Sequence, residues 1–528
     1  LSTLRYFRKE YERHVWDKKC DAFVCKGVVG ASCQSACPIG TEAWRYVAHI
    51  AWGAYDQAYQ VIRQANPFPS VCARVCNQPC ESRCRAGATG SKPVAIRALK
   101  RFITDHSDPA TYRPVRAALR EEAPPVAIVG AGPAGLTAAH YLSLMGYRVT
   151  VFESEGEPGG MLFSAIPGYR LPREVMRQEI AALIDENITL KCNTTLGRDV
   201  TLDSLFAGGF GAVFVALGAH KSLRLGLDGE DATGIIPSIR FLKAFNMRGE
   251  ELARGRVGVV GGGNSALDAA RMALRQKDVK SVTIIYRRTQ DEMPAFPEEI
   301  EAAIHEGVKL EVLTTPIKIH TRDGKLTGIE CIKNRLGDLD ASGRRKPLPI
   351  QRSEHTIPLD TLIVAVSEGS DTDCVSVAGA NRLEVNPNGT VRAEPESLAT
   401  NRPGVFAGGD VVTGPNTVVD AIASGKKAAV VIDRYLSAEP LIQPAETRLP
   451  RVYIAPPPRQ AEEIAPTDRV EVPRLPVQAR RRSFAEVEMT LSFDDATREA
   501  MRCLRCDLAF TEPKRAEELV PAQAGGAA

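Results

Sequence analysis

The chain has 528 residues, of which 44% are apolar and 25% are charged, so most of it is expected to fold into globular domains. Lys and Arg number 67 and Asp and Glu 64, and the net charge of +3 excludes a basic field that would attract nucleic acid or a membrane surface. No apolar run reaches the about 18 residues of a membrane-spanning helix, and the first residues lack the layout of a signal peptide. We therefore expect a soluble, cytoplasmic protein.

The thirteen cysteines are clustered rather than spread. Eight fall between Cys20 and Cys84, and two more form the pair Cys503 and Cys506. In a long chain without an export signal, this clustering indicates metal ligation rather than disulfides. The remaining three stand alone and are expected to be buried packing thiols, namely Cys192, Cys331 and Cys374.

The head of the chain carries two cysteine blocks. The first is Cys33 with Cys37, and the second is a four-residue repeat made of Cys72, Cys76, Cys80 and Cys84. Such spacing would line one face of a helix, but Pro79 would break that helix, so a loop that wraps a cluster is predicted. Between the blocks, one apolar-periodic segment with Thr41 as its N-cap and a second that ends at Asn66 predict a helical pair. This pair could bring both blocks together, where their thiolates suit two [4Fe–4S] clusters.

A glycine-rich turn follows the apolar run Val126–Val129 and opens a helical segment. The turn is a Gly-x-Gly-x-x-Gly sequence, which lets a pyrophosphate approach the positive end of a helix. The next apolar run ends in Glu153, the acid expected to hydrogen-bond a ribose. These features predict a dinucleotide-binding fold, the alternative being an ordinary βαβ turn. Besides Glu153, the residues assigned to this site are Gly130, Ala131, Gly132, Pro133, Ala134, Gly135 and Gly160.

A second turn, of Gly-x-Gly-x-x-Ala type, follows the strand-like run Arg256–Val260. The next strand ends with Arg287 and Arg288, where an NAD site would usually place an acid. Two guanidinium groups suit a 2′-phosphate, which favours NADPH over NADH, whereas the alternative is that both are solvated surface charges. The turn residues assigned to this site are Gly261, Gly263, Asn264, Ser265 and Ala266.

Residues 404–418 resemble the second FAD motif of two-dinucleotide flavoproteins. The resemblance implies that Asp410, after Gly409, binds the ribityl chain of FAD. It also implies that a helix beginning near Thr417 and Val418 faces the flavin. The alternative is that Asp410 merely caps a helix. Farther on, a Pro-rich stretch without periodicity predicts a linker or a strap over the surface.

Taken together, residues 33–434 resemble the small subunit of NADPH-dependent glutamate synthase. They are also similar to the matching half of dihydropyrimidine dehydrogenase and to the large subunit of the NADH-dependent ferredoxin:NADP oxidoreductase. The motifs that carry the resemblance are Cys33–Pro38, Arg74–Cys84, Pro93–Ile96, both glycine turns, Tyr286–Arg288 and Met293–Ala295. The resemblance implies two [4Fe–4S] clusters, FAD and a site for NADPH or NADH.

One departure concerns the cluster ligands. Relatives begin this module with a Glu-Ala-x-Arg-Cys-x-x-Cys segment, which occurs here near the far end as 499–506. We expect this segment to fold back, so that one cluster takes Cys33, Cys84, Cys503 and Cys506. The other would take Cys37, Cys76 and Cys80. Its fourth ligand would be Cys72, because this chain has Lys100 where several relatives have Gln or Glu.

A second departure lies at the start, which resembles the segment that ends the NADH-binding flavoprotein subunits of complex I-like hydrogenases. With the tail pair in a cluster, His14, Cys20 and Cys25 are left for a structural Zn²⁺ whose fourth ligand is missing. In the competing assignment, Cys20 and Cys25 join the first cluster and the tail pair is idle. His14 would equally fit a plain surface residue.

The predicted fold class is α/β, with two Rossmann-like domains that bind FAD and NAD(P), preceded by an α-helical iron–sulfur domain. The expected boundaries are 1–119 for the iron–sulfur domain, 120–225 and 370–440 for the FAD domain, 226–369 for the NAD(P) domain, 441–490 for the Pro-rich strap, and 491–528 for the cysteine-bearing segment with a disordered tail.

The predicted function is an NAD(P)H dehydrogenase subunit of a hetero-oligomeric redox complex, which exchanges electrons with a partner subunit. Ferredoxin is one candidate partner, and electron bifurcation is left open. No acid, base or nucleophile of the protein is assigned a catalytic role. Two rivals remain: a disulfide reductase that uses Cys503 and Cys506, and a relay subunit with an inactive nicotinamide site. The second rests on 365–368, which read Ala-Val-Ser-Glu where relatives have Ala-Ile-Gly-Gln.

Overall fold

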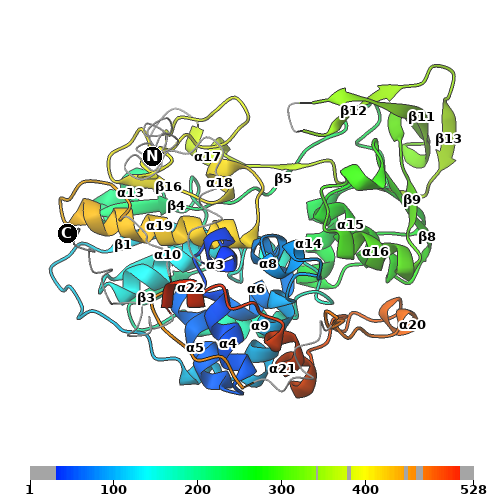
Figure 1. Ribbon diagram of the computed structural model, residues 1–528. Coiled ribbons are helices and arrows are strands. Elements are labelled where there is room, and N and C mark those ends of the chain that lie inside the picture. Colours follow the sequence, from blue (N-terminus) through cyan, green and yellow to red (C-terminus); the bar gives the residue numbers. More distant parts are fainter. Residues whose placement is uncertain (1–30, 341–342, 377–381, 445–449, 459–467, 512–528) are drawn as a thin grey trace, which may run out of the picture.

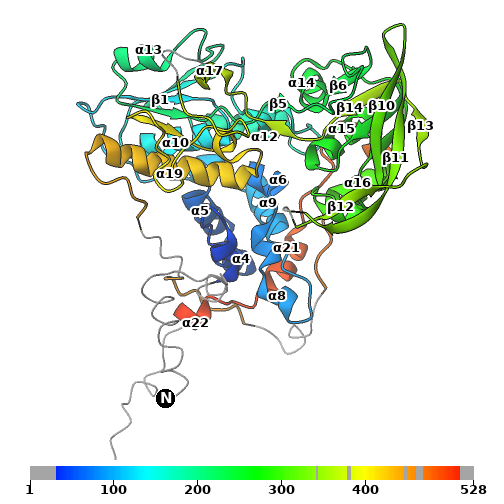
Figure 2. The same cartoon turned by 90° about the horizontal axis from the view of Figure 1, so that it is seen from above.

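The computed structural model describes residues 31–340, 343–376, 382–444, 450–458 and 468–511 (Figure 1). Two α/β units lie side by side, and a helical module packs against both (Figures 1 and 2). In the described part of the chain, no helix has the length and apolar character needed to cross a bilayer.

The helical module is built from amphipathic helices whose apolar faces meet in one core. Tyr46, Ile50 and Ile62 are fully buried there. Its helices are α3 (Ser32–Ala36), α4 (Ala43–Ala51), α5 (Tyr55–Ala65), α6 (Pro69–Val75), α7 (Pro79–Ser82), α8 (Arg85–Ala88) and α9 (Ile96–His106).

Two local predictions about this module have different outcomes. The predicted helix break at Pro79 is confirmed, because α6 ends at Val75 and Pro79 opens α7. The predicted N-cap at Thr41 is wrong, since α4 begins after Glu42 and no side chain caps it. The N–H of Ala43 instead donates to the Thr41 backbone carbonyl at 2.8 Å, so the Thr41 hydroxyl is not used as a cap.

The first α/β unit contains a parallel sheet in the order β16-β4-β1-β2-β3. Its strands are short and apolar, as expected for a sheet covered on both faces. They are β1 (Val126–Val129), β2 (Val149–Phe152), β3 (Ile188–Lys191), β4 (Ala212–Val215) and β16 (Val405–Ala407). Helix α10 (Pro133–Leu144) packs on α19 (Val418–Leu436), and the other helices of this unit are α11 (Met161–Ser164), α12 (Arg173–Ala181), α13 (Leu202–Ala207), α17 (Asp373–Ser376) and α18 (Asp410–Thr413).

The second α/β unit repeats this plan with a parallel sheet in the order β6-β14-β7-β8-β9. The strands are β6 (Ile235–Pro237), β7 (Gly255–Val260), β8 (Val279–Ile285), β9 (Lys309–Glu311) and β14 (Thr361–Val364), and the helices are α14 (Ser238–Arg248), α15 (Asn264–Leu274) and α16 (Pro297–Glu306). An antiparallel layer extends from it, comprising β10 (Thr314–Arg322), β11 (Lys325–Leu339), β12 (Arg345–Pro349) and β13 (His355–Pro358). The two units are joined by β5 (Lys221–Ser222) and β15 (Glu368–Gly369), which pair antiparallel.

The C-terminal part returns to the helical module. Helix α21 (Phe493–Met501) packs on α4 and α9, after the short α20 (Val477–Arg480) and before α22 (Leu508–Thr511). The fully buried Glu499 fixes it there by accepting hydrogen bonds from the backbone N–H groups of Ala95 and Val470, both at 2.8 Å. The two ends of the described chain therefore meet in one module, which accounts for the tail cysteines considered below.

Candidate functional site

Both glycine turns open into one cavity of about 1430 Å³ between the two parallel sheets. Its lining includes Val129 and Val260, which are the last residues of β1 and β7, so it lies at the carboxyl ends of both sheets. Open α/β sheets bind their ligands at this edge. The volume exceeds the roughly 300–1,000 Å³ of ordinary ligand pockets, so the cavity has room for two large cofactors.

The first turn has the close packing that its glycines predict. A Cβ atom on Gly135 would lie 1.9 Å from the carbonyl oxygen of Gly130, so only glycine allows the helix to start this close to the strand. No atom lies within 4 Å of the Cβ position of Gly132, which faces open space beside the cavity. Glu153 accepts a hydrogen bond from the N–H of Ala131 at 2.8 Å, and Gly160 also lines the cavity. This arrangement fits a pyrophosphate at the start of α10 and a ribose beside Glu153.

The second FAD motif closes the same site from the other side. Asp410 follows β16 and Gly409, and it lines the cavity. Burial raises the pKa of Asp410 to about 7, with further contributions from the nearby carboxylates of Asp420 and Glu368. Thr417 is the N-cap of α19 and accepts from the N–H of Asp420, and α19 begins at Val418 as expected. The half-buried carboxyl of Asp410 can form hydrogen bonds with the hydroxyls of a ribityl chain.

The second turn repeats the first with its own close approach. A Cβ on Gly261 would lie 2.1 Å from the carbonyl oxygen of Ala365, and the φ angle of Gly261 is +145°. Gly263 faces open space, and α15 begins directly after it. The Asn264 side chain accepts from the N–H of Phe296 at 3.1 Å, so it ties the turn to α16 rather than pointing into solvent. Ser265 hydrogen-bonds Glu368, while the Ala266 side chain is buried behind the turn.

Arg287 and Arg288, to which the sequence assigns the same role, differ in the structure in their exposure and in their ion pairs. Arg288 is only 3% exposed, pairs with Asp340 at 2.5 Å and donates to the Arg345 carbonyl at 2.6 Å. Arg287 is exposed, lines the cavity, and makes no ion pair within the described residues. Arg344, which sequence reasoning missed, also lines the cavity. No local motif could have revealed it, because a β-hairpin brings it there from a distant part of the chain.

The junction of the two sites contains the segment that departs from the relatives. Val366, Ser367 and Glu368 all line the shared cavity. Burial raises the pKa of Glu368, and one of its carboxylate oxygens has no hydrogen-bond partner among the described residues. The sequence change therefore lies where both cofactor sites meet.

The first cysteine group comprises Cys33, Cys84, Cys503 and Cys506. All four line one cavity of about 30 Å³ in the helical module. Burial raises the pKa of the Cys33 thiol, and the other three cysteines raise it further because their charges lie within reach. The structure thus brings together the head and tail cysteines.

The second cysteine group comprises Cys37, Cys72, Cys76 and Cys80 and surrounds a lysine. Lys100 is 8% exposed. Burial alone would lower its pKa, but the neighbouring charges of all four thiols raise it. Cys72, the expected substitute ligand, lies beside Cys76 and Lys100 and is fully buried.

The donor chemistry of both groups fits iron–sulfur clusters. Four soft thiolates are the usual ligand set of a [4Fe–4S] cluster. Within the described ranges, no three His, Cys, Asp or Glu side chains are arranged to hold a single metal ion. A cluster binds each thiolate through a different iron atom, so its ligands lie farther apart than those of one ion. His14, Cys20 and Cys25 lie outside the described residues.

The three isolated cysteines are only partly as expected. Cys331 is fully buried, whereas Cys192 and Cys374 are half-buried, so the prediction of burial is wrong for these two. Cys374 packs against Gly197 at the edge of the shared cavity, where the fold leaves its side chain partly open. Burial raises the pKa of each of the three thiols.

Two phosphate-binding turns that share one cavity define an oxidoreductase that uses FAD and a pyridine nucleotide. Residues 124–425 match the family model described as pyridine nucleotide-disulphide oxidoreductase, and residues 6–111 match dihydropyrimidine dehydrogenase domain II, 4Fe-4S cluster. The chain belongs to this flavoprotein family, in its glutamate synthase small-subunit-like branch with an N-terminal iron–sulfur domain. The expected resemblance, fold class and enzyme class are confirmed.

Curated relatives are similar over most of the chain. The NADP(+)-dependent formate dehydrogenase subunit beta of Moorella thermoacetica is 39% identical, over 91% of this chain and 71% of that protein. The NADPH-Fe(3+) oxidoreductase subunit beta of Geobacter sulfurreducens is 34% identical, over 96% and 80%. The small chain of glutamate synthase [NADPH] from Escherichia coli is 34% identical, over 79% and 91%.

Among solved structures, Mycobacterium tuberculosis FprA in complex with NADPH is similar in fold. It aligns with a TM-score of 0.51 and 19% identity, over 60% of this chain and 85% of that one. At this identity the similarity concerns the fold alone.

Proposed function

We propose that this chain is the NADPH-oxidising subunit of a multi-subunit redox complex, and that it exchanges electrons with a partner subunit through FAD and two [4Fe–4S] clusters. The observation that carries the proposal is the shared cavity, which residues of both turns line at the carboxyl ends of both sheets. When bound there, FAD would accept two electrons as hydride and release them singly, which iron–sulfur clusters require.

The chain's own residues supply binding and orientation. Helix α10 and Glu153 would hold one dinucleotide, and Asp410 would orient its ribityl chain. Helix α15 would bind the pyrophosphate of the second, with Arg287 and Arg344 beside its ribose. The two cysteine groups would hold the clusters, and His14, Cys20 and Cys25 would hold a structural zinc ion.

The proposed preference for NADPH rests on Arg287, since Arg288 is already paired with Asp340. We expect Arg287→Ala to raise the KM for NADPH by about 10- to 100-fold, which corresponds to one or two charge-assisted hydrogen bonds. The KM for NADH should stay within about twofold, because NADH lacks the 2′-phosphate. An equal loss with both nucleotides would contradict this assignment.

The function itself is tested by anaerobic mixing with either nucleotide. We expect bleaching of the flavin absorbance with NADPH, together with iron and inorganic sulfide in the purified protein. Inertness toward both NADPH and NADH would reject the proposal. If NADPH reduces the flavin, co-purification from the native source identifies the subunits that accept the electrons, with ferredoxin as a candidate. Assays of the purified complex with these acceptors test whether the electrons are bifurcated.

The geometry disfavours the disulfide reductase. Burial raises the pKa of both tail thiols, to about 12 for Cys503, whereas redox-active thiols have a lowered pKa. Neither thiol lines the cavity that contains the glycine turns.

A further inference from the structure

Residues 473–489 form a hairpin that contacts all three parts of the molecule, and we call it the brace hairpin. Its two arms are joined by backbone hydrogen bonds from Leu475 N–H to the Val487 carbonyl and from Met489 N–H to the Pro473 carbonyl, at 2.9 and 2.8 Å. Helix α20 lies at its tip. The hairpin lies within 441–490, the stretch for which the sequence predicts a linker or a surface strap, but the pairing of its two arms was not predicted.

One arm of the brace hairpin is fixed to the iron–sulfur module by partly buried ion pairs. Glu486 accepts from Arg74 Nε at 2.7 Å and pairs with Arg101 at 2.9 Å. Glu488 binds both terminal nitrogens of Arg97, at 2.9 and 3.2 Å. These arginines belong to α6 and α9, the helices that also carry Cys72 and Lys100.

The tip contacts the nicotinamide unit. Phe484 stacks on Phe245 of α14, with ring centroids 4.3 Å apart and an interplanar angle of 26°. The Ser483 carbonyl accepts from Arg275 Nε at 3.0 Å. Arg480 lies 3.9 Å from Glu306 of α16. On the FAD side, the N–H of Val487 donates to the carbonyl of Tyr169 at 2.9 Å.

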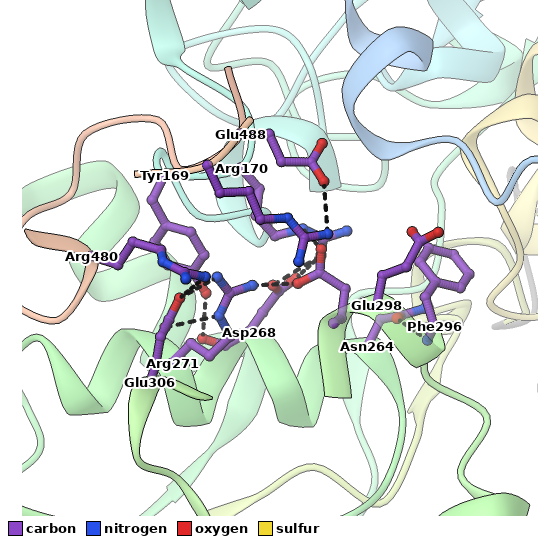
Figure 3. Close-up of polar contacts among 12 residues, drawn as sticks. Tyr169, Arg170, Asn264, Asp268, Arg271, Phe296, Glu298, Glu306, Arg480 and Glu488 are labelled. Atoms are coloured by element: carbon purple, nitrogen blue, oxygen red, sulfur yellow. Dashed lines mark hydrogen bonds and ion pairs between the residues drawn. The ribbon is translucent and has the colours of Figure 1, made fainter. Parts of the chain in front are cut away.

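Beneath the brace hairpin, the two α/β units are joined by a buried charge network (Figure 3). Arg170 of the FAD unit binds both oxygens of Asp268 in α15, at 2.8 and 2.9 Å. The guanidinium groups of Arg271 and Arg275 lie over the Tyr169 ring, 4.8 and 4.1 Å from its centroid. Separating Arg170 from Asp268 would leave two buried charges without each other, and Arg271 and Arg275 would lose their contact with the Tyr169 ring. Rotation of the nicotinamide unit is therefore strongly opposed.

We propose that the brace hairpin positions the nicotinamide unit for hydride transfer, so that NADPH meets the flavin in one fixed arrangement of the two units without rotation between them. Phe484 and Glu486 act as positioning residues, because they join the nicotinamide unit and the iron–sulfur module through a single element. The inference rests on the proposed function, in which the shared cavity holds both cofactors.

Hydride transfer requires this kind of positioning. Reacting atoms must approach to about 3–3.5 Å, and a misplacement of about 1 Å can cost 100-fold in rate. The brace hairpin lies outside the cavity, so a change in it should alter the rate and leave nucleotide binding in place.

The experiment compares three variants of the holoprotein. Phe484→Ala removes the stacking contact, and Phe484→Leu restores an apolar filling. Arg482→Ala is the matched control, because Arg482 lies in the same hairpin, is exposed and makes no side-chain hydrogen bond or ion pair among the described residues. For each variant we would measure the rate of flavin reduction by NADPH, the affinity for NADP⁺, and amide hydrogen exchange in peptides that cover Tyr169 and α15.

We expect Phe484→Ala to slow flavin reduction by about 10- to 100-fold, with NADP⁺ affinity within about threefold of the native protein. Exchange should increase around Tyr169 and α15, Phe484→Leu should recover most of the rate, and Arg482→Ala should match the native protein. If Phe484→Ala does not fold, Glu486→Gln replaces it in the experiment. This variant should also slow flavin reduction, keep NADP⁺ affinity and increase exchange around Tyr169 and α15.

Three results would overturn the inference: an unchanged rate in Phe484→Ala, an equal loss in Arg482→Ala, or a loss of NADP⁺ affinity that accounts for the whole change in rate. A native protein that neither nucleotide reduces would reject the proposed function instead. Even with such an inactive protein, the positioning role of the brace hairpin can be tested by amide hydrogen exchange. Exchange around Tyr169 that is the same in Phe484→Ala and in the native protein would reject that role.

Discussion

The first cysteine group draws its thiols from both ends of the chain, whereas the second draws all of its thiols from residues 37–80. Leu504, between two cysteines of the first group, is 53% exposed. In the second group Cys72 is fully buried and Lys100 nearly so. One group thus depends on the docking of a tail at the surface, and the other belongs to the core of the module.

The two groups also differ in charge. Lys100 places a buried cation beside all four thiols of the second group. Near the first group, Arg85 hydrogen-bonds Cys506. A charge enclosed in a low-dielectric interior acts more strongly than one at the surface. The comparison teaches that two four-cysteine groups in one small module can differ in how they are assembled and in the charges beside them. The following predictions test the consequences in order of decreasing effect.

The largest effect is expected for the double variant Cys503→Ser and Cys506→Ser. It should lose about half of its iron and sulfide and keep FAD, because one of two [4Fe–4S] clusters has lost half of its ligands. Iron analysis and EPR of the reduced protein check this, with the half-buried Cys192→Ser as control. Unchanged iron would favour Cys20 and Cys25 as ligands, and loss of all iron would show that the groups are not independent.

Replacement of the buried Lys100 should shift the reduction potential of the cluster held by the second cysteine group, without loss of that cluster. We expect Lys100→Met to lower the reduction potential of one cluster by on the order of 100 mV, the effect of a unit charge at about 6 Å with an effective dielectric constant of about 20. The reduction potential should fall because the Lys100 cation stabilises the reduced cluster, which is the more negatively charged state. A potentiometric EPR titration measures it, and the exposed Lys92→Met should have little effect because salt screens its charge. An upward shift would contradict the prediction.

Release of the tail should affect the first group selectively. Glu499 anchors α21 through Ala95, Val470 and Arg502, and its removal leaves the buried Arg502 without this carboxylate. Glu499→Ala should destabilise the docked tail by about 3–5 kcal/mol and lower the iron content of the first group before that of the second. Thermal unfolding with iron analysis checks this against Arg498→Ala, whose side chain is exposed on the same helix. Equal loss from both groups would refute the selectivity.

The smallest effect is confined to acid pH. Burial would raise the pKa of Glu488, but Arg97 and its neighbours hold it at about 2, below the ordinary 4.5. Its stabilising contribution, up to a few kcal/mol at about 1.4 kcal/mol per pKa unit, is therefore present above pH 4.5 and lost as pH falls toward 2. The difference in melting temperature between the native protein and Glu488→Gln should shrink over this range. A difference that is constant with pH would rule out the ion pair as its cause.

Much of the fold could be read from local patterns. The run Val126–Val129 is a strand with those bounds, and both glycine turns connect a strand to a helix as predicted. The N-cap at Thr41 failed because a backbone carbonyl competes with the side chain. Arg287 and Arg288 could not be told apart, since the partner of Arg288 lies on a distant hairpin.

The sequence by itself determined the two dinucleotide units and the cysteine blocks, because strand, turn and helix patterns depend on contacts between residues a few positions apart. Resemblance to relatives suggested the return of the tail, but only the tertiary structure placed Cys503 beside Cys33 and laid the brace hairpin across three modules. Those arrangements depend on burial and ion pairing between segments hundreds of residues apart, for which a local pattern carries no signal.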